Sequence, residues 1–183
     1  MPKRLTTALI ALVITASPAA AQQIESAYTD VDLDQCLLLQ ADDFGARWAC
    51  PGYKGYPVMI AEGDLRFFVS YGFGAPDERA ASQTPPPFNT LGPRIEWRLS
   101  NADGGFRPFA TILRFYTSRE DGEDEAQVLV VTRLEDGATC HVAYIDATAN
   151  DGANEMAREA ADELAPDFDC EDEPERVGDF EAW

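Results

Sequence analysis

The sequence predicts an α+β fold: an antiparallel sheet of about five to seven strands with one C-terminal helix packed on it, and two disulfides. Three observations lead to this class. Short apolar runs that alternate with polar residues recur between turns rich in Gly and Asp, which is typical of antiparallel strands. The apolar period then lengthens to that of an amphipathic helix near the C-terminus. Four cysteines follow a segment with the features of an export signal, which predicts an oxidising compartment.

The N-terminus has the pattern of a secretory signal peptide. Lys3 and Arg4 precede an apolar run over residues 5–16 and the small-residue segment 17–21, which predicts cleavage after Ala21. We therefore expect a periplasmic or secreted protein with one α+β domain over residues 22–170 and an acidic C-terminal tail over 171–183. No later apolar run is long enough to span a bilayer, so we expect no membrane insertion.

The first half of the mature chain contains three predicted strands. Alternation over residues 30–34 predicts a short strand with Val31 and Leu33 facing inward. Residues 58–60 and 65–71 predict a hairpin, and Leu65, Phe67, Val69 and Tyr71 are expected on one face of its second strand. Residues 72–93 are expected to be a long loop, either for recognition or as a surface excursion.

Four further strands are expected to form a meander. Residues 95–99 place Ile95, Trp97 and Leu99 inward and Glu96 and Arg98 outward. The remaining three strands are expected over residues 109–118, 127–134 and 139–146.

Residues 151–165 predict the helix. Asn150 or Asp151 is expected to cap its start, and Pro166 ends it. The expected buried face consists of Ala153, Met156, Ala157, Ala160 and Leu164.

The four cysteines allow three pairings. We expect the sequential one, Cys36–Cys50 and Cys140–Cys170, because it closes the shortest loops. No two cysteines have the Cys-x-x-Cys spacing of a thiol oxidoreductase.

The chain is strongly acidic. Its net charge is −19, and residues 22–183 keep 12 of the 14 basic residues and all 33 acidic ones, a net charge of −21. Such a charge argues against nucleic acid as a partner, because affinity for phosphates depends on Lys and Arg. It permits a cationic protein, for example a lysozyme, or another envelope component as a partner, although it also fits a merely well-solvated surface.

The strongest binding candidate is the turn at residues 48–56. Tyr53 and Tyr56 flank Lys54 on a turn that a Cys36–Cys50 bond would stiffen, and rigid aromatic residues suit recognition of a protein or sugar surface. The alternative is that Trp48 belongs to the core and the tyrosines cover the edge of the sheet.

Catalytic and metal sites are weakly supported. His141 is the only histidine, and neither Ser70 nor Ser118 lies in a Gly-x-Ser-x-Gly motif, so a serine triad is not expected. A zinc site lacks nitrogen and sulfur ligands, and no cofactor is expected. Calcium candidates are the acidic tip at residues 120–125 and the aspartates of 30–34, but the latter lack the Gly and Glu of an EF-hand loop.

Several segments together resemble a family of small secreted proteobacterial proteins to which no activity is assigned. The resemblance rests on residues 28–36 (YTDVDLDQC), 48–58 (WACPGYKGYPV), 62–66, 140–147 and 153–161. It implies a location outside the cytoplasm and transfers no functional residue.

The leading hypothesis is therefore a non-catalytic periplasmic binding protein or envelope-associated protein. The alternative is a carboxylate-dependent hydrolase acting on envelope material, for which the sequence singles out no pair of acidic residues.

Overall fold

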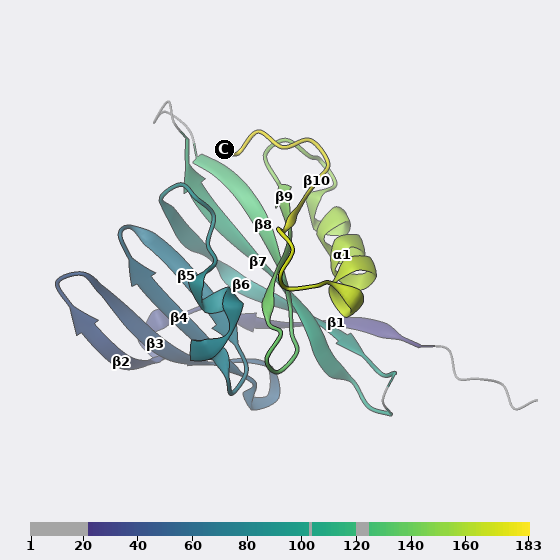
Figure 1. The fold of residues 1–183 in the computed structure, drawn as a ribbon, viewed down its shortest axis with the longest axis horizontal. Coiled ribbons are helices and arrows are strands. Elements are labelled where there is room, and N and C mark those ends of the chain that lie inside the picture. Colours follow the sequence, from purple (N-terminus) through teal and green to yellow (C-terminus); the bar gives the residue numbers. More distant parts are fainter. Residues whose placement is uncertain (1–21, 103, 120–124) are drawn as a thin grey trace, which may run out of the picture.

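Two β-sheets and one helix form three layers in the computed structural model, which describes residues 22–102, 104–119 and 125–183 (Figure 1). The α+β class and the C-terminal helix are as predicted. Both disulfides, Cys36–Cys50 and Cys140–Cys170, are confirmed. The expected signal peptide and most of the acidic tip at 120–125 lie outside the described residues.

The strands are more numerous than expected and divide between two sheets. Sheet A has the order β1-β6-β7-β8-β9-β10 and is antiparallel except for the parallel pair β9 and β10. Sheet B is antiparallel with the order β2-β3-β4-β5. The strands of sheet A are β1 Ile24–Asp30, β6 Asn89–Ser100, β7 Arg107–Ser118, β8 Glu125–Arg133, β9 Cys140–Asp146 and β10 Glu175–Val177. Those of sheet B are β2 Leu37–Asp42, β3 Gly45–Pro51, β4 Pro57–Gly63 and β5 Arg66–Tyr71.

The main core lies between the two sheets. Ile95, Trp97 and Leu99 of β6 are buried there, as the alternation predicts. They meet buried side chains of sheet B, among them Ile60 and Tyr71. Burial of this apolar surface is the principal force that holds the sheets together.

The start of the mature domain differs from the prediction. Residues 30–34 do not form a strand: β1 ends at Asp30, and Leu33–Gln35 form the 3-10 helix η1. Val31 and Leu33 nevertheless pack against the intersheet core. A further difference concerns Leu65, which has a positive φ of 59° in the β4–β5 turn and is exposed, and so does not share the inward face of β5.

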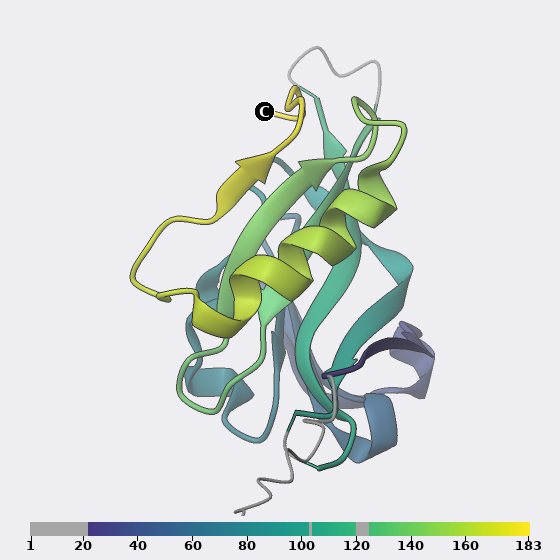
Figure 2. The same cartoon turned by 90° about the vertical axis from the view of Figure 1, so that its right-hand side faces the viewer.

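The second core lies between sheet A and α1 (Ala153–Leu164), which crosses the other face of the sheet (Figure 2). The predicted alanine face is buried, and the helix ends before Pro166. The predicted cap is wrong: Gly152 occupies the N-cap position, and the Asn150 side chain instead donates to the carbonyl oxygens of Asp146 and Asp179.

This second core also changes the environment of Glu96 and Arg98. Both were expected to face outward, and they do point away from sheet B, but they are buried near α1. Glu96 accepts from Arg158 at 2.7 Å, and Arg98 forms an ion pair with Asp162 at 2.5 Å. The alternation of a strand identifies its two faces but cannot show that a second layer covers the outer one.

The expected loop at 72–93 is partly regular. It contains the 3-10 helices η3 (Ala75–Asp77) and η4 (Arg79–Ser82), and β6 already begins at Asn89. Pro93 therefore lies inside a strand, which is tolerated because the β6–β7 register shifts between Leu91 and Ile95. The Pro93 carbonyl accepts from the Val31 N–H at 2.8 Å.

The same segment ties sheet B to the β8–β9 end of sheet A. The buried carboxylate of Glu78 accepts from the backbone N–H groups of Gly137 and Thr139, at 2.7 and 2.9 Å. Gln83 accepts from the His141 N–H at 2.8 Å. The segment thus bridges the two sheets on this side.

The C-terminal residues 171–183 return to the body of the molecule. Residues 175–177 add β10 to sheet A, Ala182 is buried, and Phe180 and Trp183 pack against the intersheet core. Across the described ranges, no helix has both the length and the apolar composition needed to cross a membrane.

Candidate functional site

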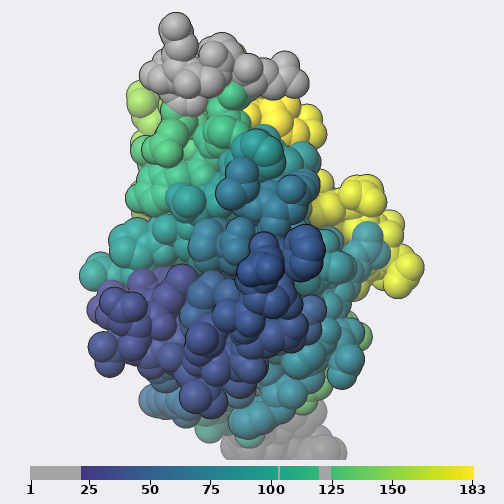
Figure 3. Space-filling view, turned by 90° about the vertical axis from the view of Figure 1, so that its left-hand side faces the viewer, coloured from purple at the N-terminus to yellow at the C-terminus, as the bar shows by residue number. Residues whose placement is uncertain are grey.

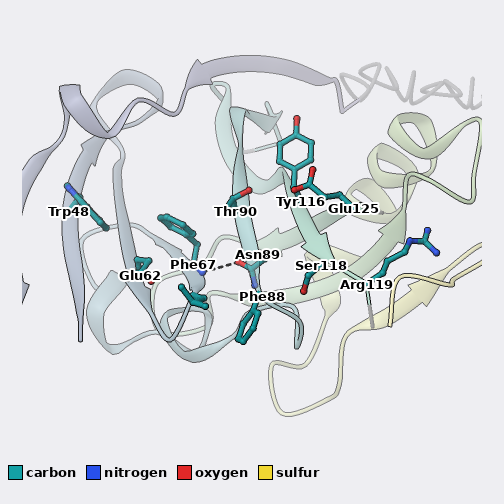
Figure 4. Close-up of a pocket in the computed structure, with 11 residues that line it drawn as sticks. Trp48, Glu62, Phe67, Phe88, Asn89, Thr90, Tyr116, Ser118, Arg119 and Glu125 are labelled. Atoms are coloured by element: carbon teal, nitrogen blue, oxygen red, sulfur yellow. Dashed lines mark hydrogen bonds between the residues drawn. The ribbon is translucent and has the colours of Figure 1, made fainter. Parts of the chain in front are cut away.

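A cleft opens between the two sheets at the end where the β4–β5 turn lies (Figure 4). Its volume is about 680 Å³, which is within the usual range of ligand sites. We call it the intersheet cleft. It is lined by Trp48, Glu62, Leu65, Phe67, Phe88, Asn89, Thr90, Tyr116, Ser118, Arg119 and Glu125.

The cleft lies where β1 no longer borders sheet A, so that β6 is the edge strand of that sheet. β1 pairs with β6 only over Arg94–Ser100, so the Asn89–Leu91 part of β6 lies beyond the reach of β1. In sheet B, Leu38, Trp48, Ile60 and Val69 pair in one row across the four strands and so share one face.

Burial falls along this row toward the edge of sheet B. Ile60 and Val69 are fully buried, Trp48 is half-buried, and Leu38 is 53% exposed. The core-facing side of sheet B thus emerges from beneath sheet A as an apolar wall.

One buried amide fixes the far wall of the cleft. Asn89 accepts from the Phe67 N–H at 2.9 Å, and its side-chain NH₂ lies within hydrogen-bonding distance of three oxygens. These are the Thr84 hydroxyl at 3.1 Å and the carbonyls of Pro85 and Pro87 at 3.2 and 3.0 Å. The amide thereby ties the proline-rich segment, which carries Phe88, to β5.

Beside the cleft, β2 forms the exposed edge of sheet B. Its three leucines, Leu37, Leu38 and Leu39, are 68%, 53% and 55% exposed, and Phe44 in the following turn is 89% exposed. Figure 3 shows β2 and β3, in dark blue, on the surface of the molecule. Edge strands expose unpaired backbone groups, so a long apolar edge strand is a template for pairing with another chain.

The surroundings of this edge are acidic. Gly45 pairs with Gly63, so the β2–β3 and β4–β5 turns lie at the same end of sheet B. These turns and the strand ends next to them carry Asp42, Asp43, Glu62 and Asp64, which outnumber the nearby Arg47 and Arg66, and Arg66 pairs with Asp64. The Phe44 N–H donates to the Asp42 carboxylate, which lowers the pKa of Asp42 and keeps the group ionised.

The aromatic turn proposed from the sequence lies elsewhere, at the opposite end of sheet B. Tyr53 and Tyr56 are half-buried against Trp97, with ring centroids 6.4 and 5.7 Å away. A Cβ atom at Gly52 would clash with the Trp97 ring, so the backbone of the turn packs directly against the core. Lys54 is exposed and its Nζ lies 5.1 Å from the centre of the Tyr53 ring. The tyrosines thus cover part of the core, as in the alternative, whereas Trp48 is only half-buried and lines the intersheet cleft.

His141 is buried within β9 and has almost no contact with solvent. Its Nδ1 lies 2.9 Å from the Tyr144 hydroxyl. Burial lowers its pKa to about 3, so the ring is neutral at physiological pH and a poor proton acceptor. Ser70 is also buried, whereas Ser118 lines the intersheet cleft; neither forms a hydrogen bond with His141.

Two of the aspartates of residues 30–34 have structural partners for their carboxylates. Asp30 forms an ion pair with Arg94 at 3.3 Å, and Asp32 accepts from the Asp34 N–H at the start of η1. No group of three or more His, Cys, Asp or Glu side chains suited to a metal occurs in residues 22–102, 104–119 and 125–183.

Sequence reasoning missed the intersheet cleft because its walls come from six strands and the segment before β6. The only local indication was the run of leucines after Cys36, which alternation cannot distinguish from a buried segment. Comparisons with family models, with curated proteins and with solved structures found no match to this chain.

Proposed function

We propose that this protein is a non-catalytic binding protein, periplasmic or secreted, that captures an extended apolar segment of a cationic partner. The observation that carries the proposal is the apolar wall of the intersheet cleft, which continues through Trp48 to the exposed Leu38 of the edge strand β2. Two disulfides support an oxidising compartment, because such bonds persist outside the cytoplasm.

The shape and composition of this surface favour a chain segment as the ligand. A strand added beside β2 would use the free backbone groups of the edge, and its side chains would reach Leu38 and Trp48. Large exposed apolar side chains gathered in this way are typical of interaction sites.

Charge selects the partner. The chain carries a net charge of −19, and beside the apolar wall Asp42, Asp43, Glu62 and Asp64 outnumber Arg47 and Arg66. Like charges disfavour a second copy of this chain, whereas a basic protein such as a lysozyme would be attracted and steered toward the site. An envelope component with the same combination of positive charge and apolar side chains is an equivalent ligand.

The experiment measures binding of lysozyme, as a cationic probe protein, to oxidised protein comprising residues 22–183. Isothermal titration at 0.05 and 0.15 M salt is compared for the native protein, Leu38→Ser and Phe73→Ser. Phe73 is the control, because it is 85% exposed but follows the opposite end of β5. We expect Leu38→Ser to weaken binding up to about tenfold, since burying the exposed half of this leucine contributes roughly 0.8–1.5 kcal/mol, and Phe73→Ser to leave it unchanged.

Equal effects of the two substitutions on affinity would contradict the proposal. So would binding that is lost at 0.15 M salt and is not weakened by Leu38→Ser. Either result would mean that lysozyme binds through non-specific charge attraction and not at the apolar wall. Turnover of a cell-wall substrate that a single Asp or Glu substitution abolishes would instead favour the hydrolase.

A further inference from the structure

A second pocket lies on the opposite face of sheet A, beside α1. Its volume is about 500 Å³, and three arginines line it: Arg94 from β6, Arg114 from β7 and Arg158 from α1. We call it the arginine pocket. Sheet A separates the arginine pocket from most of the intersheet cleft. Tyr116 lines both.

The strand alternation explains why the arginines meet. Ile95, Trp97 and Leu99 fill the intersheet core, so Arg94 and Glu96 point to the other face. On β7, Leu113 and Phe115 fill the same core, which places Arg114 beside them on the outer face. Because α1 packs mainly over β8 and β9, it leaves this corner of the sheet uncovered (Figure 2).

Most cations of this region have carboxylate partners. Arg158 holds both oxygens of Glu96, at 2.7 and 3.2 Å, and reaches Glu155 at 3.1 Å. Arg94 pairs through Nε with Asp30 at 3.3 Å at the exposed rim.

Arg114 is different. Its guanidinium donates to two neutral amide oxygens, Gln127 Oε1 at 2.8 Å and Asn154 Oδ1 at 3.1 Å. Among the residues that the structure describes, no carboxylate lies within ion-pair distance of it. The group is half-buried, so a positive charge is fixed in place and oriented without being neutralised.

The remaining walls suit the apolar part of a ligand. Ile112 and Leu129 lie beside Arg114 on the sheet, and the rings of Tyr28 and Tyr116 stand at the edges of the pocket. A guanidinium fork recognises a planar carboxylate through two parallel hydrogen bonds.

We propose that the arginine pocket is a binding site for a small organic carboxylate with an aromatic or aliphatic body, and that Arg114 is its principal ligand. One unneutralised guanidinium matches a single negative charge, which favours a monoanion over a phosphate dianion. The site lies on the opposite face of sheet A from the proposed partner-binding surface, and Tyr116 is the lining residue that the two share.

The test uses benzoate as the probe and benzyl alcohol as its uncharged analogue. Binding is followed by the ¹H–¹⁵N signals of the arginine Nε–H groups in the full domain. We expect saturable shifts of the Arg114 signal with benzoate, no saturable shift with benzyl alcohol, and weaker binding of inorganic phosphate than of benzoate.

Two variants complete the experiment. Arg114→Gln should weaken benzoate binding about tenfold, because it removes the charged fork. Arg107→Gln is the matched control: Arg107 is exposed on the same strand and does not line the pocket, so its loss should change nothing.

Equal binding of benzoate and benzyl alcohol would overturn the proposal, as would equal effects of the two substitutions. Tighter binding of phosphate than of benzoate would overturn the assignment to a monoanion. The comparison of the two probes on the native protein does not depend on whether Arg114→Gln folds.

Discussion

The amide of Asn89 is the most informative single group to remove. It is only 4% exposed and holds the proline-rich segment against β5 through bonds to Phe67, Thr84, Pro85 and Pro87. Asn89→Ala removes all of these bonds and leaves several backbone groups without a partner. The far wall of the intersheet cleft, including Phe88, loses its anchor.

The magnitude follows from a count of simultaneous bonds. The NH₂ group has two hydrogens shared among three acceptors, and the carbonyl accepts once, so three hydrogen bonds exist at one time. At about 1 kcal/mol each, the expected loss is about 3 kcal/mol. This is a large part of the ~5–15 kcal/mol stability of an ordinary domain.

Urea unfolding with intact disulfides measures the loss. With a slope of about 2 kcal/mol/M, the midpoint should fall by about 1.5 M. Asn101→Ala is the control, because the only partner of the Asn101 side chain among the described residues is Gln23, at the exposed start of β1. A loss below about 1 kcal/mol for Asn89→Ala, or one no larger than that of the control, would refute the assigned role.

Two further predictions concern buried charge and pH. Asp162→Ala should destabilise by about 3 kcal/mol because it removes two charge-assisted hydrogen bonds, worth about 1.5 kcal/mol each, from the buried guanidinium of Arg98, which keeps only Ser26 and the more distant Glu96 at 3.7 Å. Glu155→Ala, which breaks an exposed pair, should cost at most about 0.5 kcal/mol, and similar losses in urea unfolding would contradict this. Burial lowers the pKa of His141 to about 3 from an ordinary value of 6.5, so between these values the unfolded chain binds a proton that the native state does not. Native stability relative to His141→Gln should therefore fall on acidification, by up to ~1.4 kcal/mol per pH unit, and a difference that does not change between pH 6 and 4 would count against a neutral buried ring.

Local patterns in the sequence determined most of the regular elements. The alternation around Trp97 identified the inward face of β6, and the alanine spacing at 153–160 identified the buried face of α1. The pairing of the cysteines followed from short loop lengths. Each of these features depends on residues that are close in the chain, so each is visible without the fold.

Features that depend on distant segments escaped prediction. Pro93 suggested a loop, yet it lies in β6 because a bulge there removes the need for its N–H. Glu96 and Arg98 had the pattern of a solvated face, yet a helix more than 50 residues later covers them.

The candidate sites divide in the same way. The sequence by itself determined a strongly acidic chain with two disulfides and an aromatic turn, and so the kind of partner that charge would attract. Only the tertiary structure decided that Tyr53 and Tyr56 cover Trp97, that β2 leaves its leucines at an edge, and that Arg114 meets Arg94 and Arg158. Composition fixes which charges a chain carries, but the pairing of strands distant in sequence fixes which of them remain exposed and unneutralised.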